Sequence, residues 1–466
     1  MAVWSTTNVI EITKNRRIDS EFFHPEYISI ERLVNKLDSI EPLGKLGKFL
    51  IGPFGSAFHV SNYDPNSKYR YVRGKDVKPF NLQDDDNVYM PEKDFFRLSK
   101  YALAKDDLLI SVVGTLGNVA IVPEGVEGIF SCKSTVFRNS TIDPYFLLAY
   151  FNSKYGRLCL LRRQRGAIQT GLNKEDLKTV PVPIIDNKKQ TNIGNKIRKS
   201  LELSIKSKSL YSQATQLLED ALGFNQIEFK KEKSYTATFS EIVSNNRADA
   251  DFYQTKYRQL VTHLETINTV RLGSICNITK GIEVGSAAYT EHGPLFIRVS
   301  NLSKEGFVQG NSDKYISESL YNSLKAYQPN VGDILLTKDG TIGTCYVVDE
   351  MVEGIISGGI LNLALISPEI PKEYLALVIN SKACNMQANR DCSGALILHW
   401  KPEEIRKLKI PILTTDLMKK LNELAIESKI ARKESKQLLE QAKQEVEQLI
   451  EKAAKNKQTK ISAKSN

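Results

Sequence analysis

The chain has 466 residues, of which 41 % are hydrophobic and 25 % charged, so it is not a disordered protein and is long enough for roughly two to four domains. It lacks the run of about 18 apolar residues that a membrane span needs, the residue order of a signal peptide and any C-x-x-C pair among its six cysteines, so we expect a cytoplasmic protein without a disulfide framework. The net charge of +10, from 64 Lys and Arg against 54 Asp and Glu, is compatible with nucleic acid as a partner and equally with an ordinary basic surface.

The first half of the chain predicts a mixed α/β domain that leads into a long helix. Residues 69–77, 107–114 and 118–123 carry β-branched side chains between turns, which is typical of short strands. Residues 144–164 have helical periodicity, so they predict one amphipathic helix that ends near Gly166. Val180–Ile184 (VPVPI) then leaves the domain as an extended segment, because its prolines break helices.

The second half of the chain repeats these segments in the same order. NRRIDSEFFHPEY at residues 15–27 is matched by NNRADADFYQTKY at residues 245–257. The offset between matched residues stays between 225, from Arg73 to Arg298, and 230, from Arg17 to Arg247. This spacing is too large for a solenoid repeat, so it predicts that a whole domain and its helix occur twice.

The repeat predicts α/β (mixed α+β) architecture with two tandem, similar globular domains, each followed by a long helix. The predicted boundaries are 1–185 for the first domain, 186–223 for its helix, 224–244 for a connector, 245–413 for the second domain, 414–456 for its helix and 457–466 for a basic tail. Apolar residues recur in both helices at spacings near 3.5 residues, which predicts that they pair as a coiled coil. The residues expected in this contact are Ile193, Leu203, Leu210, Ala214, Leu218 and Leu222 in the first helix and Leu421, Ala431, Leu438, Ala442, Val446 and Ile450 in the second.

Two short glycine motifs occupy matched positions in the copies. They are Gly114-Thr-Leu-Gly117 and Gly340-Thr-Ile-Gly343, and each follows a predicted strand. A phosphate-binding loop needs Lys and Ser or Thr directly after its last glycine, and neither motif has them. We therefore predict a tight turn between two strands at each site.

The sequence contains little that suggests catalysis. The five histidines do not cluster, and neither H-E-x-x-H nor G-x-S-x-G occurs. The Asn/Asp-Pro-Pro-aromatic motif expected of an amino-methyltransferase is also missing. The acidic run Asp84–Asp86 could hold a metal ion, but its flanks supply no ligand geometry, and a solvated loop is the favoured interpretation. Together these features indicate a binding or organising role.

Polar and basic residues near the loops of each copy are candidates for contacts with DNA. Ordinary surface charge is the competing explanation for each one alone, but such residues recur at matched positions while their neighbours differ. Two domains that bind different base sequences need the same fold with different side chains at the loops that contact DNA. Neutral drift would produce the same difference between the loop sequences. The candidates are Lys48, Ser56, Arg73, Lys75, Arg165 and Gln169 in the first copy and Lys280, Ser286, Arg298, Asn301, Lys338 and Lys401 in the second.

Nearly the whole chain resembles the specificity subunit of a type I restriction–modification system. The resemblance rests on the matched segments 106–117 and 332–343, on the Asn-Ser-Lys helices, and on the exit at residues 394–413 with its twin. It implies two target-recognition domains that bind double-stranded DNA at two half-sites, and two helices that pack antiparallel and set the half-site spacing. It also implies two methyltransferase subunits and a nuclease/translocase subunit as partners. Those partners would use S-adenosylmethionine, ATP and Mg, and this chain would carry no cofactor and no metal.

Three alternatives to this interpretation remain open at the level of sequence. The N-terminal block also fits recognition subunits of related type II systems, in which the partner is a methyltransferase–nuclease fusion. A nuclease with a site around Asp84–Asp86 or Asp333 would show metal-dependent cleavage. A coiled-coil scaffold protein that reads no DNA would show no sequence preference and a weak dependence of binding on salt.

Overall fold

The computed structural model describes residues 4–166, 170–230, 232–308, 310, 312–394 and 397–462. The chain divides into two compact units, a first unit of Met1–Leu203 with Lys433–Asn466 and a second unit of Ser204–Arg432. The division passes through both long helices, so it differs from the linear order of domain, helix, domain and helix expected from the sequence. Of the helices in the described ranges, none is both long and apolar enough to cross a membrane.

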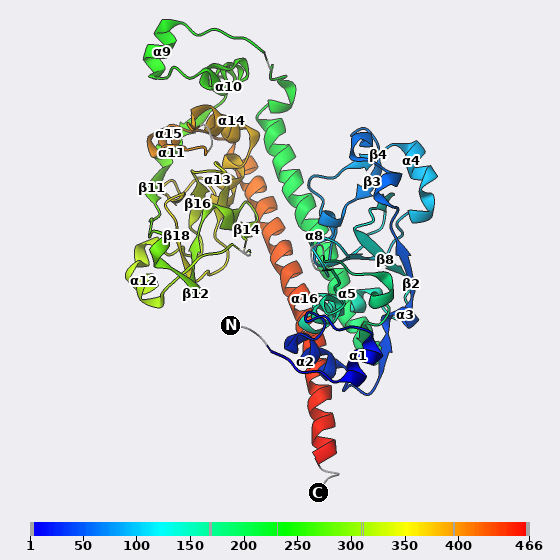
Figure 1. The fold of residues 1–466 in the computed structure, drawn as a ribbon. Helices are drawn as coiled ribbons and strands as arrows, with labels where there is room; N and C mark the ends of the chain where they lie inside the picture. Colours follow the sequence, from blue (N-terminus) through cyan, green and yellow to red (C-terminus); the bar gives the residue numbers. More distant parts are fainter. Residues whose placement is uncertain are drawn as a thin grey trace. The chain divides into compact units, whose positions relative to one another are not determined.

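The first unit contains three small sheets and seven short helices within the described residues (Figure 1). Its strands are β1 (Ile40–Pro42), β2 (Lys48–Ile51), β3 (Tyr69–Val72), β4 (Tyr89–Met90), β5 (Leu108–Ser111), β6 (Val119–Ile121), β7 (Gly128–Phe130), β8 (Ser134–Arg138) and β9 (Pro181–Pro183). Its short helices are α1 (Val9–Asn15), α2 (Pro25–Val34), α3 (Leu43–Leu46), α4 (Glu92–Arg97), α5 (Pro144–Asn152), α6 (Lys154–Leu161) and α7 (Lys174–Leu177). The sheet orders are β2-β8-β5-β6, β4-β3-β7 and β1-β9.

The central strand of the first unit is buried on both of its faces. Leu108 and Ile110 belong to one hydrophobic cluster, which includes α5 and α6, while Leu109 belongs to another with Val72 and Phe130. Successive side chains of a strand point to opposite faces, so this continuous apolar run separates two cores.

The second unit repeats this topology with one addition. Its sheets have the orders β11-β19-β16-β17, β15-β12-β18 and β10-β20, and the hairpin β13-β14 has no counterpart among the described strands of the first unit. Its strands are β10 (Thr269–Arg271), β11 (Cys276–Lys280), β12 (Tyr289–Ile297), β13 (Leu302–Ser303), β14 (Gly306–Phe307), β15 (Tyr315–Ile316), β16 (Ile334–Thr337), β17 (Cys345–Val347), β18 (Gly354–Ile356), β19 (Ile360–Leu365) and β20 (Lys409–Pro411). Its short helices are α9 (Phe239–Asn245), α10 (Thr255–Glu265), α11 (Leu272–Ile275), α12 (Glu318–Ser323), α13 (Lys372–Ile379), α14 (Lys382–Asp391) and α15 (Pro402–Arg406). Helix α9 begins inside the segment 224–244 that the sequence predicted as a connector.

The single helix predicted over residues 144–164 is two helices, because the chain breaks at Ser153. This residue is extended, its hydroxyl accepts a hydrogen bond from the Gly156 amide at 3.3 Å, and it donates to the Tyr150 carbonyl at 2.6 Å. Serine in this position caps the second helix and ends the first. Ser381 separates α13 from α14 in the second unit and donates to the Val378 carbonyl at 2.6 Å, but its side chain makes no capping bond to α14, so the two copies share the helix break and not the cap.

The two long helices, α8 (Asn187–Ala221) and α16 (Thr415–Ser462), pair within each unit. In the first unit Ser200 and Ser435 each donate a hydroxyl hydrogen bond to the other's backbone carbonyl at 2.8 Å. Lys196 there forms an ion pair with Glu445, so residues earlier in α8 meet residues later in α16 and the helices run antiparallel. In the second unit Ser207 and Ser428 make the same reciprocal bonds, also at 2.8 Å.

Each unit uses both long helices to complete its core. Ala442, Val446 and Ile450 of α16 join Ile193 of α8 in the main cluster of the first unit, and Ala214, Leu218, Leu222 and Leu421 join the main cluster of the second. Leu203 and Ala431 are buried, whereas Leu210 and Leu438 are only half-buried. Leu439, not Leu438, packs against the cluster of the first unit.

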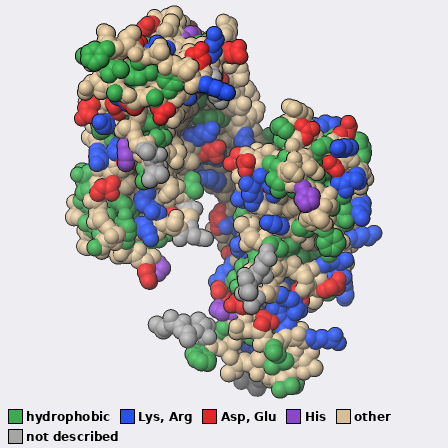
Figure 2. All heavy atoms as spheres, turned by 45° about the horizontal axis from the view of Figure 1, so that its top comes forward, with side chains coloured by type: hydrophobic (Ala, Val, Ile, Leu, Met, Phe, Trp, Pro, Cys, Tyr) green, Lys and Arg blue, Asp and Glu red, His purple; other side chains and the backbone are tan. Residues whose placement is uncertain are grey.

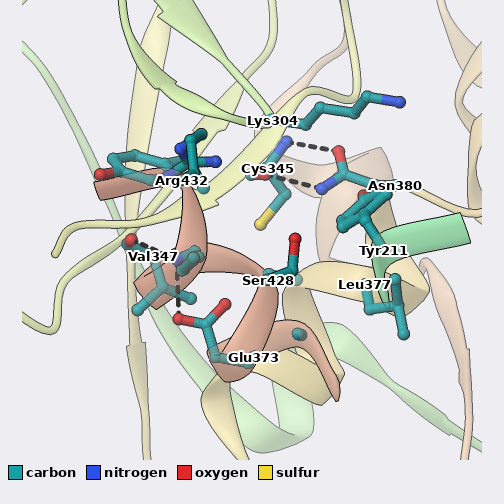
Figure 3. Close-up of a pocket in the computed structure, with 13 residues that line it drawn as sticks. Tyr211, Lys304, Cys345, Val347, Glu373, Leu377, Asn380, Ser428 and Arg432 are labelled. Carbon is teal, nitrogen blue, oxygen red and sulfur yellow. Dashed lines mark hydrogen bonds and ion pairs between the residues drawn. The ribbon is translucent and has the colours of Figure 1, made fainter. Parts of the chain in front are cut away.

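In the second unit, α16 is attached to the sheet through a small polar site (Figure 3). Lys429 donates to the Val347 carbonyl and to Glu373, at 2.7 Å each. Asn380 bonds both backbone groups of Cys345, which ties α13 to β17. The cavity between these groups measures about 20 Å³, which is enough for about one water molecule.

Candidate nucleic-acid interface

The two glycine motifs form the hairpin turns β5–β6 and β16–β17, which confirms the prediction of tight turns. Gly114 and Gly117 have φ angles of 87° and 73°, and Gly340 and Gly343 have 65° and 80°. Glycine adopts this left-handed region without steric cost, which explains why each turn carries two. Each turn closes with a backbone bond, from Gly117 to the Ser111 carbonyl at 3.0 Å and from Gly343 to Thr337 at 2.9 Å.

In the first copy, Arg73 and Lys75 meet one carboxylate of the acidic run. Arg73 lies at the end of β3 and bonds Asp76 through Nε and Nη2, while Lys75 forms a 2.8 Å ion pair with Asp86. The hydrogen bond from Lys75 lowers the pKa of Asp86, with a smaller contribution from Arg73. The first residue of the run, Asp84, lies 3.9 Å from Arg70. Asp84 and Asp86 are therefore each paired with a basic residue beside the run.

In the second copy, Arg298 and Asn301 repeat this turn with different partners. Arg298 is the counterpart of Arg73 and donates to the Ser312 carbonyl at 2.5 Å. Asn301 is 1 % exposed, and its amide donates to the Val308 carbonyl at 3.0 Å and to Asp313 at 2.7 Å. The amide of Asn301 is thus used inside the unit, so the structure assigns this residue a structural role in place of a contact with DNA.

Beside the second glycine turn lies a polar cluster that the first copy lacks. Lys338 is 9 % exposed and pairs with Asp339 at 2.5 Å, and Asp339 bonds His399 Nδ1 at 2.8 Å. Burial acts to raise the pKa of Asp339, but the hydrogen bonds from Lys338 and His399 outweigh it and lower the pKa. The matched positions in the first copy are Val112, Val113 and Gly171. This cluster therefore gives the tip of the second copy a surface chemistry of its own.

The loop after α6 contains two of the candidates in the first copy. Arg165 forms a two-bond ion pair with Asp176, at 2.5 and 2.8 Å, and this hydrogen bonding raises the pKa of Arg165. Gln169 lies outside the described residues. In the second copy, Lys401 is exposed and its backbone amide donates to Glu404 at the start of α15.

The remaining candidates are exposed side chains at strand ends and in short turns. Lys48 begins β2 and Lys280 ends β11, while Ser56 and Ser286 each lie in a short 3₁₀ turn. Figure 2 shows Lys and Arg side chains across the visible face of the molecule, with Asp, Glu and apolar side chains among them. Charge alone therefore does not mark one surface for DNA on this face, and the contacts with DNA remain predictions.

The structure also reveals residues that the sequence analysis missed. The serine pairs of the long helices were overlooked because serine does not belong to an apolar stripe. A signal for them existed, because Ser200 and Ser207 recur as Ser428 and Ser435, each 228 residues further along the chain. His399 was overlooked because only the fold brings it to Asp339. Within the described residues, no three His, Cys, Asp or Glu side chains come together in a group that could hold a metal ion.

A family model and several solved structures are similar to this chain. Residues 54–209 match the family model described as type I restriction modification DNA specificity domain. Among solved structures, the S subunit of a type I restriction–modification system from M. genitalium is 15 % identical, with 90 % of this chain and 96 % of that chain covered and a TM-score of 0.45. The HsdS subunit from Thermoanaerobacter tengcongensis is 14 % identical, with 89 % and 96 % covered and a TM-score of 0.27. No curated protein matches the chain.

The family match covers much of the first copy, and the second copy repeats the fold of that part. The matched residues 54–209 include β5, the first glycine turn and the start of α8. The second copy has the same strand order, the same turn and its own long helix. Over residues 54–209 the chain is similar to the type I restriction modification DNA specificity domain.

Proposed function

We propose that this chain is the non-catalytic subunit that selects the DNA sequence on which its partners act, and that each copy reads one half of a split target. The observation that supports this is the repetition of one strand order with different side chains at the tips. At the glycine turn, Lys338, Asp339 and His399 of the second copy replace Val112, Val113 and Gly171 of the first. At the turn after β3, Arg73 pairs with Asp86, whereas its counterpart Arg298 bonds the Ser312 carbonyl. Two copies of one scaffold with unlike tips are suited to two unlike half-sites.

The paired helices supply a physical reason for a fixed gap between the half-sites. Both hydroxyls of each serine pair are hydrogen-bonded, so sliding one helix along the other would leave buried polar groups without partners. A fixed helix register fixes the separation of whatever the helices carry, as in dimeric DNA-binding proteins.

The partners and their cofactors belong to the same proposal. A repeated chain offers equivalent surfaces, which suits two identical methyltransferase subunits, with a nuclease/translocase subunit joining for restriction. S-adenosylmethionine, ATP and Mg would be bound by those subunits and not by this chain. The complex would act on chromosomal DNA in the cytoplasm.

A map of N6-methyladenine across the genome tests the proposal. Hosts that express the chain together with its neighbouring methyltransferase gene are compared with hosts that lack only this chain. We expect a split motif, two short blocks around a fixed gap, that disappears when this chain is missing. An unchanged map in cells that make both proteins would contradict the proposal.

A second measurement addresses the non-catalytic role. The purified chain is incubated with DNA and Mg, with and without the methyltransferase. We expect neither cleavage nor methylation by the chain alone. Metal-dependent cleavage that is lost in Asp86→Asn or Asp333→Asn would instead favour the nuclease interpretation.

A further inference from the structure

Each copy contains the same three-residue arrangement before its first strand, Arg-x-Asp-x-x-Phe. In the first copy Arg17 bonds Asp19 through Nε at 2.8 Å and through Nη2 at 2.7 Å. In the second, Arg247 bonds Asp249 in the same two-bond manner, at 2.7 Å each. These hydrogen bonds lower the pKa of both carboxyls. A two-bond pair holds the guanidinium in one orientation.

The guanidinium that bonds the aspartate also donates hydrogen bonds to two backbone carbonyls at or just after the end of a helix. Arg17 donates to the carbonyls of Arg163 at 3.4 Å and Gln164 at 2.5 Å, directly after α6. Arg247 donates to the carbonyls of Asp391 at 2.6 Å and Cys392 at 3.1 Å, at the end of α14. Asp391 is the last residue of α14, where carbonyls lack partners within the helix and carry its negative dipole, so a cation stabilises them. Arg163 and Gln164 follow the end of α6 by two and three residues.

The phenylalanine of each motif is enclosed by two arginines. Phe22 lies 4.5 Å from the guanidinium carbon of Arg17 and 4.2 Å from that of Arg162. Phe252 lies 4.9 Å from both Arg247 and Arg390. Arg162 and Arg390 come from the same helix ends that receive the hydrogen bonds. Each motif therefore holds one helix end by hydrogen bonds and by two contacts between a guanidinium and the same ring.

The helix ends that accept these hydrogen bonds are also the points where the loops beside the glycine turns begin. The residue after the bound carbonyls is Arg165 in the first copy and Ser393 in the second. Arg165 pairs with Gly171 by two backbone bonds of 2.8 Å, and Ser393 pairs with His399 by bonds of 2.9 and 2.7 Å. The far ends of the loops continue the contact, since Leu172 bonds Val112 and Trp400 bonds Lys338. The described ends of each loop therefore connect the helix end to the strand before the glycine turn.

We propose that each Arg-x-Asp-x-x-Phe motif is a clamp that positions the reading loop of its own copy, so that Arg17 governs one half-site and Arg247 the other. The proposal rests on the proposed function, because it assumes that the loops contact DNA. The clamp residues act through the loop and are therefore positioning residues. The motif recurs after 230 residues and the helix end after 228, so the chain between them differs in length in the two copies. The same hydrogen bonds form in both copies all the same, which supports a role for this contact.

The decisive variants are Arg17→Lys and Arg247→Lys, each introduced alone into the full chain with its methyltransferase. Lysine keeps the charge but has no planar fork, so it cannot bond the carboxylate and two carbonyls together. Phe22→Leu is a milder second variant that removes the stacking while keeping an apolar side chain. Ile18→Ala is the matched control, because Ile18 lies inside the motif and is 84 % exposed.

Methylated motifs give the first measurement. We expect Arg17→Lys to relax base preference in one block of the motif only, by about 5- to 150-fold, which is the discrimination of one lost base contact. Arg247→Lys should relax the other block, and Ile18→Ala neither. Equal loss at both blocks, or two intact blocks in all clamp variants, would overturn the proposal.

Amide hydrogen exchange gives a second measurement that needs no methylation. In Arg17→Lys we expect faster exchange at Gly171 and Leu172, with His399 and Trp400 unchanged, and the reverse in Arg247→Lys. Unchanged exchange in both would overturn the clamp whatever the methylation map shows. A wild-type chain that directs no motif would refute the proposed function, and faster exchange in the variants would then separate that failure from a failure of the clamp.

Discussion

The two copies agree in their central strands and differ at their glycine turns. Strands β5 and β16 are fully buried, and both alternate their side chains between two hydrophobic clusters. At the glycine turns, by contrast, valine and glycine in the first copy are replaced by Lys338, Asp339 and His399 in the second. Packing constrains the scaffold, because a buried strand tolerates few changes in volume, whereas the tips are free to acquire new chemistry.

Each core also contains residues from the long helix that follows the other copy. Leu222 follows α8, next to the first copy in sequence, but packs in the core of the second unit. Ile450 of α16 follows the second copy but packs in the core of the first unit. Each core therefore needs a helix that is distant from it in the sequence. The stability of one unit cannot be assigned to a continuous stretch of the chain.

The largest expected effect comes from truncating these two residues. Leu222 and Ile450 occupy matched positions, and each is 2 % exposed. Replacing either by alanine leaves a cavity and should cost about 2–5 kcal/mol of unfolding free energy. We expect Leu222→Ala to raise hydrogen exchange in β16 and β19 of the second unit, and Ile450→Ala to raise it in β5 and β8 of the first.

The control for this crossed pattern is Leu210→Ala, at a half-buried position of α8, which should have a smaller effect than Leu222→Ala or Ile450→Ala. Destabilisation of the first unit by Leu222→Ala, as its place in the sequence suggests, would contradict the assignment of cores.

A smaller effect is expected at the serine pairs. Ser200→Val adds bulk where two helix backbones approach closely and removes the buried hydrogen bond that the Ser200 hydroxyl donates, at a cost of about 1–3 kcal/mol. Ser428→Val is the same change 228 residues later and should act on the second unit. Chemical denaturation of both variants is compared with Ser209→Val, at an exposed serine of α8. A loss as large in Ser209→Val would show that helix propensity, and not the pair, carries the effect.

Periodicity and repetition predicted most of the fold, and long-range contacts explain what they missed. The strands around Leu108 and Ile334 and the extended exits were found because local patterns specify them. The break at Ser153 was missed because helical periodicity continues across it. The antiparallel pairing was inferred from a family resemblance, and only the structure gave its register, through Ser200 and Ser435.

The candidate site was predicted less well than the fold, for a physical reason. Basic residues near loops can be found in a sequence, but their partners cannot, because a partner depends on which loops meet. Asn301 was expected to face DNA and is buried instead. The clamp motif was visible as a repeat around Arg17 and Arg247, but nothing in the sequence showed that a helix end accepts their hydrogen bonds.

A pH-dependent difference between the copies is expected at Glu373. Burial raises the pKa of Glu373 above its ordinary value of 4.5, although Lys429 opposes this. The protonated form is thus favoured in the folded state, so the stabilising contribution is full below about pH 4.5 and is lost as pH rises through the raised pKa. Glu373→Gln should remove this part of the pH dependence from the second unit.

The first unit supplies the internal control, because its matched residue is Tyr145, which bonds Asp106 at 2.7 Å. Hydrogen exchange measured from pH 4 to 7 and corrected for intrinsic rates reports both units in one sample. An identical pH profile of the second unit in Glu373→Gln and wild type would show that Glu373 does not set it.

The smallest effect is expected from Asp176→Asn, which releases Arg165. The two bonds of this pair are well formed, but the Arg165 side chain is 46 % exposed, so solvent screening limits the gain to about 0–1 kcal/mol. Denaturation of the first unit should therefore change little.

The released guanidinium is expected to act on DNA instead, where one added phosphate contact steepens the dependence of log K on log salt by about one unit. The matched acidic residue in the second copy is Glu404, which contacts Arg247 at 3.5 Å, so Glu404→Gln should loosen the clamp without adding a phosphate contact. Equal salt slopes in Asp176→Asn and wild type, at unchanged stability, would remove Arg165 from the set of residues that reach DNA.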